Sequence, residues 1–445
     1  MRNNSLQILL VAILFVTLNN FCQCYIKYDV NKVSEWKSND ITDSENFKVQ
    51  NTYSNQNWQN SQSLKLSDSK IVMTIFGQRE SKSKNILDQQ LAVFDNKGNI
   101  VQSLVFENVK KYQTALSLTN VKGEFLFVYS DNVQIYMTFY DEELQVKRGS
   151  QNQQLVAYDS EKDNVQPIIS VGKDLIYIQF MVIKDKNLIL QVYVLDLSDQ
   201  SKYTIQKTHT YSNYKIEYIY ANSIQAYNDN TAIVHYFAKN DKDEDTLVQL
   251  KYDSKGSLKS GYPKELDIDL NLETEEVYWR WYSILHEDQK TSTFLASNNN
   301  DDLMIYTFGK DGKQICQNIY DLKDYLNYNY YYDIHGDQGW LYLQDKVNKE
   351  GHFTLFDPKN CSVNLKKLSG TEIFLGLAGS FLDQKNREIL MIELGSLKDS
   401  TKQESYQGMM YKIGKFENKK DDDDNQAVIV GVQFLGFIIG ILFLI

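Results

Sequence analysis

Proline and glycine are scarce in this 445-residue chain, and positive charge is in the minority. Three prolines and 21 glycines are too few for a collagen-like or proline-rich low-complexity protein. The 47 lysines and arginines are outnumbered by 58 acidic residues, which gives a formal net charge of −11. Because contact with phosphates needs clustered lysine and arginine, we expect no nucleic-acid partner. The 42% of hydrophobic residues excludes a wholly disordered chain.

Helical periodicity is almost absent between the two ends of the sequence. Apolar residues alternate over short runs separated by Asp, Asn, Ser and Lys, which is the pattern of strands and turns. The 31 tyrosines and 21 phenylalanines also favour strands, because aromatic side chains pack well on a pleated sheet. The sequence therefore predicts an all-β body.

The N-terminus has the features of a secretory signal peptide over residues 1–24. It begins with a basic residue, continues in an apolar run over residues 8–18, and ends with Cys22 and Cys24 at the two small positions before a cleavage site. Cleavage would then precede Tyr25. The alternative is a retained anchor, but the run is too short to span a bilayer comfortably.

The C-terminus combines a polar spacer over residues 418–426 with an uncharged apolar tail over residues 427–445. A spacer and tail of this kind signal attachment of a glycosylphosphatidylinositol (GPI) lipid, with Asn418 and Asp421 as candidate attachment residues. The tail is also long enough for a retained transmembrane helix. We expect the lipid anchor because no Lys or Arg follows the tail. Either alternative tethers the body to a membrane and makes it face the outside of the cell or a lumen. We expect the extracellular face of the plasma membrane, at the cell surface.

One short motif recurs along the body, in which a strand ends in an apolar residue followed by Asp or Gly and a polar turn. Successive copies are about 53 residues apart, a period typical of repeat architectures. Leu394-Gly395 competes with Ile413-Gly414 for the last copy. The copies begin at Phe94, Tyr140, Leu195, Tyr252, Phe308, Phe356 and Ile413.

A second apolar strand precedes the turn, as in residues 71–76, 125–129, 175–180, 232–237 and 340–343. Such strands are apolar on both faces, which indicates burial between packed sheets. Four short strands in a unit of this length are typical of a β-propeller blade, whereas tandem β-sandwiches would have units of about 100 residues.

We therefore predict a single seven-bladed β-propeller over residues 44–417, preceded by an N-terminal extension over residues 25–43. A ring left open would expose unpaired strand edges. We expect the strand at residues 47–53 to complete the last blade as its outer strand and close the ring.

The first blade resembles a known repeat. Phe47-Lys48-Val49-Gln50-Asn51-Thr52-Tyr53-Ser54, followed by Ser63-Leu64-Lys65-Leu66-Ser67-Asp68-Ser69-Lys70-Ile71-Val72-Met73, is similar to a degenerate propeller-blade repeat of large surface and adhesion proteins. Elsewhere in the chain only the skeleton of strand and turn matches. The resemblance implies a propeller fold and a role at the cell surface, and it implies no catalytic residues.

Motifs for catalysis or metal binding are missing from the sequence. No pair of the five histidines has the spacing of a zinc-binding helix, and no nucleophile elbow or phosphate loop occurs. Residues 241–245 alternate carboxylates as a calcium loop does, but they lack its central glycine, and a solvated hairpin tip is the alternative. We expect no enzyme and no cofactor, with calcium as the one alternative.

Two cysteines, Cys316 and Cys361, remain after the predicted cleavage. They would form one disulfide in an oxidising compartment or stay as two separate thiols, because outer strands of neighbouring blades diverge. Asn360-Cys361-Ser362 is an N-glycosylation sequon with Asn360 as the acceptor.

Two aromatic clusters are candidates for a ligand-binding surface. Tyrosine offers contact area at low entropic cost and asparagine adapts its hydrogen bonds, as in binding loops. The sequence thus favours a membrane-tethered, non-catalytic propeller that binds an extracellular protein or a glycan. A glycan-active enzyme of the secretory pathway and a structural subunit of a surface complex are the alternatives. The candidate residues are Tyr278, Trp279 and Trp281 in one cluster, and Tyr325, Tyr328, Asn329 and Tyr330 in the other.

Overall fold

The structure is a computed structural model of the chain, which divides into two units: Met1–Val30 with Ile413–Ile445, and Asn31–Lys412. Nearly all the residues that the structure describes belong to the second unit. The described residues are 30–37, 63–67, 69–77, 86–95, 100–110, 114–131, 134–149, 151–157, 167–184, 187–199, 202–211, 222–240, 242–266, 280–285, 289–297, 302–321, 331–335, 338–345, 350–357, 359–367, 377–383, 388–396 and 404–413.

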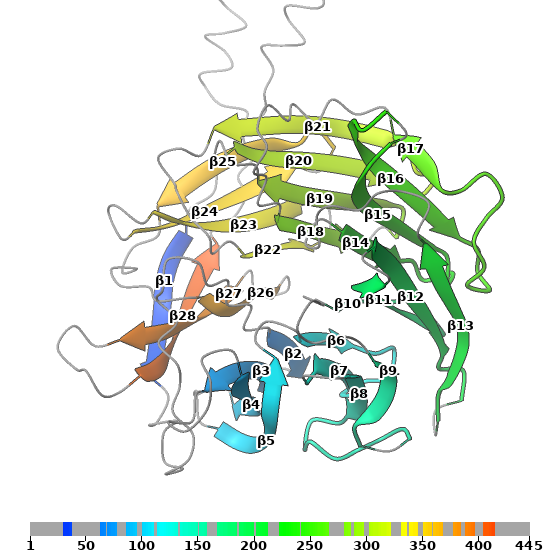
Figure 1. Cartoon of the computed structure of the whole chain (residues 1–445). Helices are drawn as coiled ribbons and strands as arrows, with labels where there is room; N and C mark the ends of the chain where they lie inside the picture. The colour runs from blue at the N-terminus through cyan, green and yellow to red at the C-terminus, as the bar shows by residue number, and fades with distance from the viewer. Residues whose placement is uncertain are drawn as a thin grey trace, which may run out of the picture. The chain divides into compact units, whose positions relative to one another are not determined.

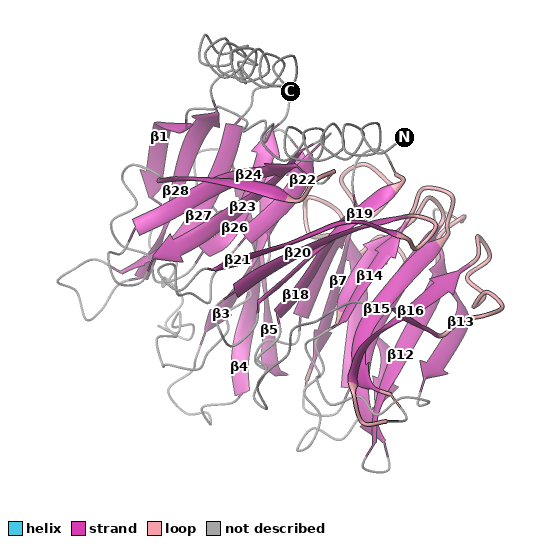
Figure 2. Ribbon diagram, turned by 90° about the horizontal axis from the view of Figure 1, so that it is seen from above, coloured by secondary structure: helices cyan, strands magenta, loops and turns pink. Residues whose placement is uncertain are grey.

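The described residues are all-β, as predicted, and Figure 2 shows strands and loops among them without a helix. None of these residues lies in a helix that is long and apolar enough to cross a membrane. The strands join into four-stranded antiparallel sheets (Figure 1). Six sheets are β2 (Ser63–Ser67), β3 (Lys70–Gly77), β4 (Ile86–Asp95) and β5 (Ile100–Lys110); β6 (Thr114–Leu118), β7 (Phe125–Ser130), β8 (Gln134–Tyr140) and β9 (Gln153–Ala157); β10 (Ile168–Val171), β11 (Leu175–Lys184), β12 (Asn187–Asp196) and β13 (Thr204–Tyr211); β14 (Asn222–Ala226), β15 (Ala232–Lys239), β16 (Asp245–Tyr252) and β17 (Lys264–Leu266); β18 (Arg280–Leu285), β19 (Thr291–Ser297), β20 (Asp302–Gly309) and β21 (Gln314–Asp321); β22 (Tyr331–His335), β23 (Gln338–Asp345), β24 (Glu350–Asp357) and β25 (Ser362–Lys367).

In each of these six sheets the strands lie side by side in chain order. The recurring motif of the sequence marks the same place in each sheet, the end of the third strand: Phe94 lies in β4, Tyr140 in β8 and Tyr252 in β16. The apolar runs that precede the motif are the second strands. Four-stranded antiparallel sheets of this kind are the units of propeller blades.

One further sheet combines the two ends of the body, in the order β1 (Val30–Lys37), β28 (Glu404–Ile413), β27 (Glu388–Ser396) and β26 (Leu377–Asp383). Counted from β26 along the chain, the third strand of this sheet is β28, after β27, and it ends at Ile413. The last copy of the motif therefore begins there and not at Leu394, which lies in β27. Residues 47–53, expected beside this strand, lie outside the described residues, and β1 occupies the place. The boundary of the extension at residue 43 is therefore wrong: Val30, Val33 and Trp36 of β1 are three residues apart and lack the alternation of a strand.

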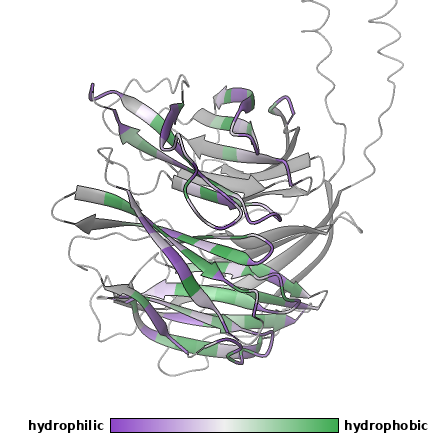
Figure 3. Cartoon of the chain, turned by 90° about the vertical axis from the view of Figure 1, so that its right-hand side faces the viewer, coloured by the Kyte–Doolittle hydropathy of each residue, from purple (hydrophilic) through white to green (hydrophobic). Residues whose placement is uncertain are grey.

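The second strands are buried because sheets pack on both of their faces. All six residues of β7 are buried, and Ala232–Ala238 of β15 are buried as well. One apolar cluster joins Tyr177 and Val192 of one sheet to Val234 and Leu250 of the next. Figure 3 shows hydrophobic residues, in green, along described strands. Each fully buried Val, Leu or Phe contributes about 1.5–3 kcal/mol of transfer free energy, so this sheet-on-sheet contact is the main source of stability.

The turns between strands share one hydrogen-bonding pattern that explains the Asp and Gly of the motif. In the turn after β16 the Asp253 carboxylate accepts from the amides of Lys255 and Ser257, both at 2.9 Å. The Gly256 amide donates to the Asp253 carbonyl at 3.0 Å. Gly256 has a φ of +69°, which glycine adopts without steric cost. The turn after β8 has the same bonds around Asp141, with Leu144 at a φ of 59°.

Replacing Gly256 with alanine should destabilise the protein more than the same change at Gly261. Both glycines have positive φ, so both variants incur the left-handed strain. An added Cβ at Gly256 would lie 2.7 Å from Val194 Cγ1 of the neighbouring sheet, whereas nothing lies within 4 Å at Gly261. We expect Gly256→Ala to lower the free energy of unfolding in urea by about 1–3 kcal/mol more than Gly261→Ala. Equal losses would contradict the packing of this turn against Val194.

Candidate functional site

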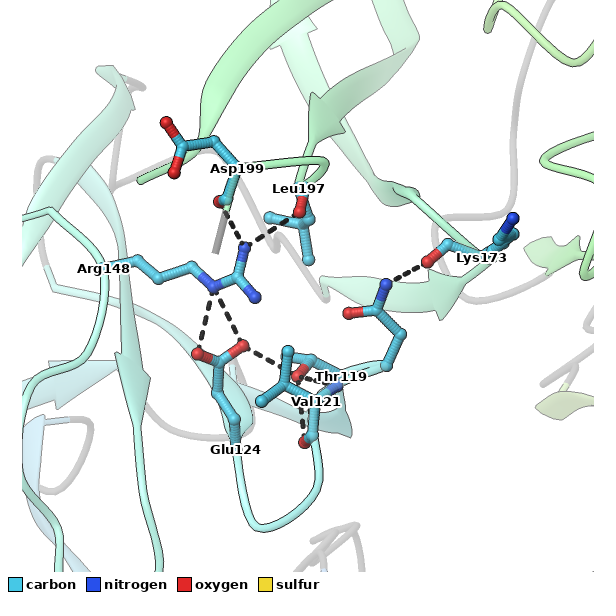
Figure 4. Close-up of polar contacts among 8 residues, drawn as sticks. Thr119, Val121, Glu124, Arg148, Lys173, Leu197 and Asp199 are labelled. Atoms are coloured by element: carbon cyan, nitrogen blue, oxygen red, sulfur yellow. Dashed lines mark hydrogen bonds and ion pairs between the residues drawn. The ribbon is translucent and has the colours of Figure 1, made fainter. Parts of the chain in front are cut away.

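The most deeply buried charge among the described residues is the guanidinium of Arg148, in the turn between β8 and β9. Its Nε donates to both carboxylate oxygens of Glu124 at 3.0 Å. Its Nη1 donates to the backbone carbonyls of Leu197 at 3.1 Å and Asp199 at 3.0 Å, in the turn that follows β12 (Figure 4). Arg148 therefore links two consecutive sheets.

This ion pair stabilises the contact between two sheets and is not a catalytic centre. The side chain of Arg148 is fully buried and that of Glu124 is 4% exposed, so no dissolved substrate reaches them. Thr119 Oγ1 donates to Glu124 Oε1 at 2.8 Å and holds the carboxylate in place. Removing one partner of such a buried pair typically costs about 3–5 kcal/mol, because the other charge is left unpaired. No motif or spacing in the sequence points to Arg148; its one signal is rarity, since the chain has 5 arginines.

His235 is a second buried polar group, at the contact between the sheets of β14–β17 and β18–β21. It shares a cross-strand row with Ser223 and Gln249. Its Nε2 lies 2.8 Å from Nε2 of Gln249, an amide that can only donate, so the imidazole accepts there and is neutral. Phe294 and Phe308 enclose the ring, with centroids 4.4 and 4.8 Å away. Burial lowers the pKa of His235 to about 3.

This environment excludes His235 as a general base for a dissolved substrate. A general base must lie within hydrogen-bond reach of the proton that it takes. His235 is fully buried and faces phenylalanine rings of the next sheet. The residue thus serves packing, as an apolar strand position suggests.

Cys316 and Cys361 form a disulfide in the structure, with their Cα atoms 5.9 Å apart. Cys316 lies in β21, the fourth strand of its sheet, and Cys361 lies in the turn that precedes β25 of the next sheet. The Cys361 carbonyl accepts from Asn318 Nδ2 at 3.3 Å and from Tyr320 Oη at 3.1 Å, both side chains of β21. The divergence of outer strands does not prevent the bond, because one cysteine lies in a turn that packs against the other's strand.

The candidate calcium loop is a hairpin tip between β15 and β16. Asn240 Oδ1 accepts from the amides of Lys242 at 2.9 Å and Glu244 at 3.0 Å, and Asn240 Nδ2 donates to Glu244 Oε2 at 3.1 Å. Asp243 has the left-handed φ of 63° that Gly256 has in its own turn. Asp241 lies outside the described residues. Across the part of the chain that the structure describes, no three metal-ligating side chains come together.

Of the aromatic candidates, only Trp281 lies in a described segment, where it pairs with Ala296 between β18 and β19. Tyr278, Trp279, Tyr325, Tyr328, Asn329 and Tyr330 lie outside the described residues. The described strands nevertheless show which elements the two clusters adjoin in the sequence. β18 begins at Arg280, directly after Tyr278 and Trp279 of the first cluster, and includes Trp281; β22 begins at Tyr331, directly after the second cluster.

The terminal predictions also fall outside the described residues. These are the signal peptide at residues 1–24, the tail at residues 427–445, and the lipid-attachment candidates Asn418 and Asp421. Asn360 is described and exposed, in the turn between β24 and β25, and its side-chain carbonyl accepts from the Ser362 amide at 2.9 Å.

Comparison with known proteins gives likeness of fold only. No family model matches the chain, and no curated protein matches it. Among solved structures, the β-propeller domain of the trilobed protease from Pyrococcus furiosus matches at a TM-score of 0.45 and 8% identity, over 85% of this chain and 98% of that one. An α-L-arabinofuranosidase from Fusarium graminearum matches at a TM-score of 0.40 and 11% identity, over 85% and 97%.

TolB from Acinetobacter baumannii matches at a TM-score of 0.37 and 10% identity, over 64% of this chain. The match spans 61% of TolB, which is less than two thirds of its length. Identities this low say nothing about what the present chain binds.

His235 should make the protein acid-labile. Its pKa is about 3 in the folded state and about 6.5 when unfolded, so below pH 6.5 the unfolded chain gains a proton that the folded chain does not. Stability should be unaffected above pH 6.5 and fall as the pH drops towards 3. We expect the wild type to lose about 2–3 kcal/mol more than His235→Gln between pH 7.5 and 4.5, by urea unfolding. The control His209→Gln, a change in β13, should lose as much unfolding free energy over this pH range as the wild type. If the unfolding free energies of the wild type and His235→Gln fall in parallel as the pH drops, this account is contradicted.

Proposed function

We propose that this protein is a membrane-tethered, extracellular β-propeller of seven blades that binds another protein or a glycan. The observation that carries the proposal is that two aromatic clusters lead directly into the first strands of two sheets in contact. Tyr278 and Trp279 precede β18, Tyr328 and Tyr330 precede β22, and β18 contacts β22.

Contacts among first strands support the closed ring. β2, β6, β10, β14, β18, β22 and β26 contact one another in that order, and β26 also contacts β2. The pairing of β1 with β28 supports closure as well, because it joins the start of the body to its end. Closing the ring would cover the apolar faces of the first and last sheets.

The disulfide supports an oxidising, extracytoplasmic location. Disulfides persist in secreted proteins and are rare in the reducing cytosol. Cys316 and Cys361 are bonded, and they are the two cysteines that would remain after cleavage of the predicted signal peptide. The tail at residues 427–445 would supply the tether.

The ligand-binding role of the aromatic clusters can be tested by substitution. We expect Trp279→Ala and Tyr328→Ala each to weaken binding of a partner, found by screening panels of glycans and extracellular proteins, by about 2 kcal/mol or roughly 30-fold in Kd, as central aromatic residues do. Lys255→Ala, an exposed change in the turn after β16, should leave the Kd unchanged. Unchanged binding in both aromatic variants would refute this surface. Turnover of a glycan would instead favour the enzyme.

The tether can be tested on intact cells with phosphoinositide-specific phospholipase C. We expect unpermeabilised cells expressing the epitope-tagged chain to stain, and the lipase to release the protein, because a polar spacer at residues 418–426 followed by an uncharged apolar tail at residues 427–445 is the pattern of a lipid-attachment signal. Retention after the enzyme, with a mass that includes residues 427–445, would show a transmembrane helix. Staining only after permeabilisation would contradict the surface location itself.

A further inference from the structure

The sequon at Asn360 and the disulfide at Cys361 occupy one turn, between β24 and β25. Asn360 is exposed, but its side-chain carbonyl accepts from the Ser362 amide at 2.9 Å. Cys361 is fully buried with a φ of 56°. The acceptor amide therefore belongs to a turn whose central residue is inside the protein.

Cys361 is held against the preceding sheet by three groups of β21. Its sulfur is bonded to Cys316, 45 residues away in sequence. Its carbonyl accepts from Asn318 and Tyr320 at 3.3 and 3.1 Å. The described contacts thus fix the sequon by its middle residue, and only opening of the disulfide frees the segment completely.

A glycosyl transfer enzyme must take the sequon into its own cleft to act on the Asn360 amide. The segment would have to leave β21, and Cys361 would have to leave the interior. A reduced and unfolded segment meets this requirement, and the bonded turn does not. The order of the two modifications then decides whether the glycan is added.

We propose that Asn360 is an N-glycosylation site that is open only before the Cys316–Cys361 disulfide forms, with a lipid-pyrophosphate-linked oligosaccharide as donor. Glycosylation forms the bond from Asn360 Nδ2 to the sugar C1, breaks the C1–O bond to the pyrophosphate, and releases the amide proton and the lipid pyrophosphate. Disulfide formation passes two electrons and two protons from the thiols to the disulfide of a thiol oxidoreductase. The inference rests on the extracytoplasmic location proposed above.

The test compares glycan occupancy at Asn360 in variants of the full chain made in eukaryotic cells. Each variant carries a reporter sequon in a flexible insert after residue 25. Enzymatic deglycosylation in heavy-oxygen water, followed by mass spectrometry, marks each site that carried a glycan. Cys316→Ser leaves residues 360–362 unchanged but removes the disulfide partner. We expect it to raise occupancy at Asn360 several-fold, and dithiothreitol given to cells making the wild type should do the same.

Glu124→Gln is the control for slow folding in general. It disrupts the buried pair with Arg148 in another sheet and keeps both cysteines. Its occupancy at Asn360 should stay below that of Cys316→Ser. Two outcomes overturn this proposal but leave the proposed location intact, provided that the reporter is glycosylated. One is equal occupancy at Asn360 in the wild type and Cys316→Ser; the other is a rise in Glu124→Gln as large as that in Cys316→Ser. An unmodified reporter overturns the proposed location and this inference with it.

Discussion

The packing of one sheet on the next is the constraint on which the rest of the structure depends. A lone four-stranded sheet whose second strand is apolar on both faces, as β7 is, would expose both of them to water. The apolar clusters of the described residues accordingly draw on two consecutive sheets: Val128 and Met137 pack with Ile178 and Phe180, and Phe106 packs with Phe127 of the following sheet. The repeat in the sequence is the length of chain needed to supply one such layer.

Polar contacts between turns fix how one sheet is aligned on the next, which apolar packing alone does not do. The Asn230 side-chain carbonyl accepts from the Asp174 amide at 2.7 Å, so the turn after β14 is tied to the turn after β10. Lys310 forms an ion pair with Asp229, whose pKa falls to about 2 because hydrogen bonds from Lys310 and Thr231 outweigh burial. These polar groups already form hydrogen bonds or ion pairs between neighbouring sheets. Their contacts therefore align one sheet on the next, and their presence is no evidence of a ligand.

Local patterns predicted the repeating parts of the fold and not the contacts that cross between repeats. The second strands and the end of each third strand follow from alternation and from turn residues, as at Tyr252 and Asp253. Strand β1 was not predicted because its apolar residues do not alternate. The partners of Arg148 could not be predicted because two are backbone carbonyls about 50 residues away, and every residue has a carbonyl, so the sequence does not mark them. The pairing of Cys316 with Cys361 stayed open because no rule of spacing says that a turn of one sheet meets the fourth strand of another.

At the disulfide, a turn of one sheet contacts the fourth strand of the preceding sheet, and the same kind of contact occurs elsewhere in the fold without a covalent bond. The carbonyl of Gly256, in the turn before β17, lies 2.8 Å from His209 Nε2 of the preceding sheet's fourth strand. The carbonyl of Cys361 meets Tyr320 of β21 in the same way. Both residues have a left-handed φ, which is free of steric cost for glycine but costs a cysteine about 1 kcal/mol or more. A bridge that closes a loop of 45 residues stabilises by up to about 4 kcal/mol in the chain-entropy account, which outweighs that strain. Cysteine is therefore tolerated at this left-handed position because it is bonded, and a reduced chain would keep the strain without the compensation.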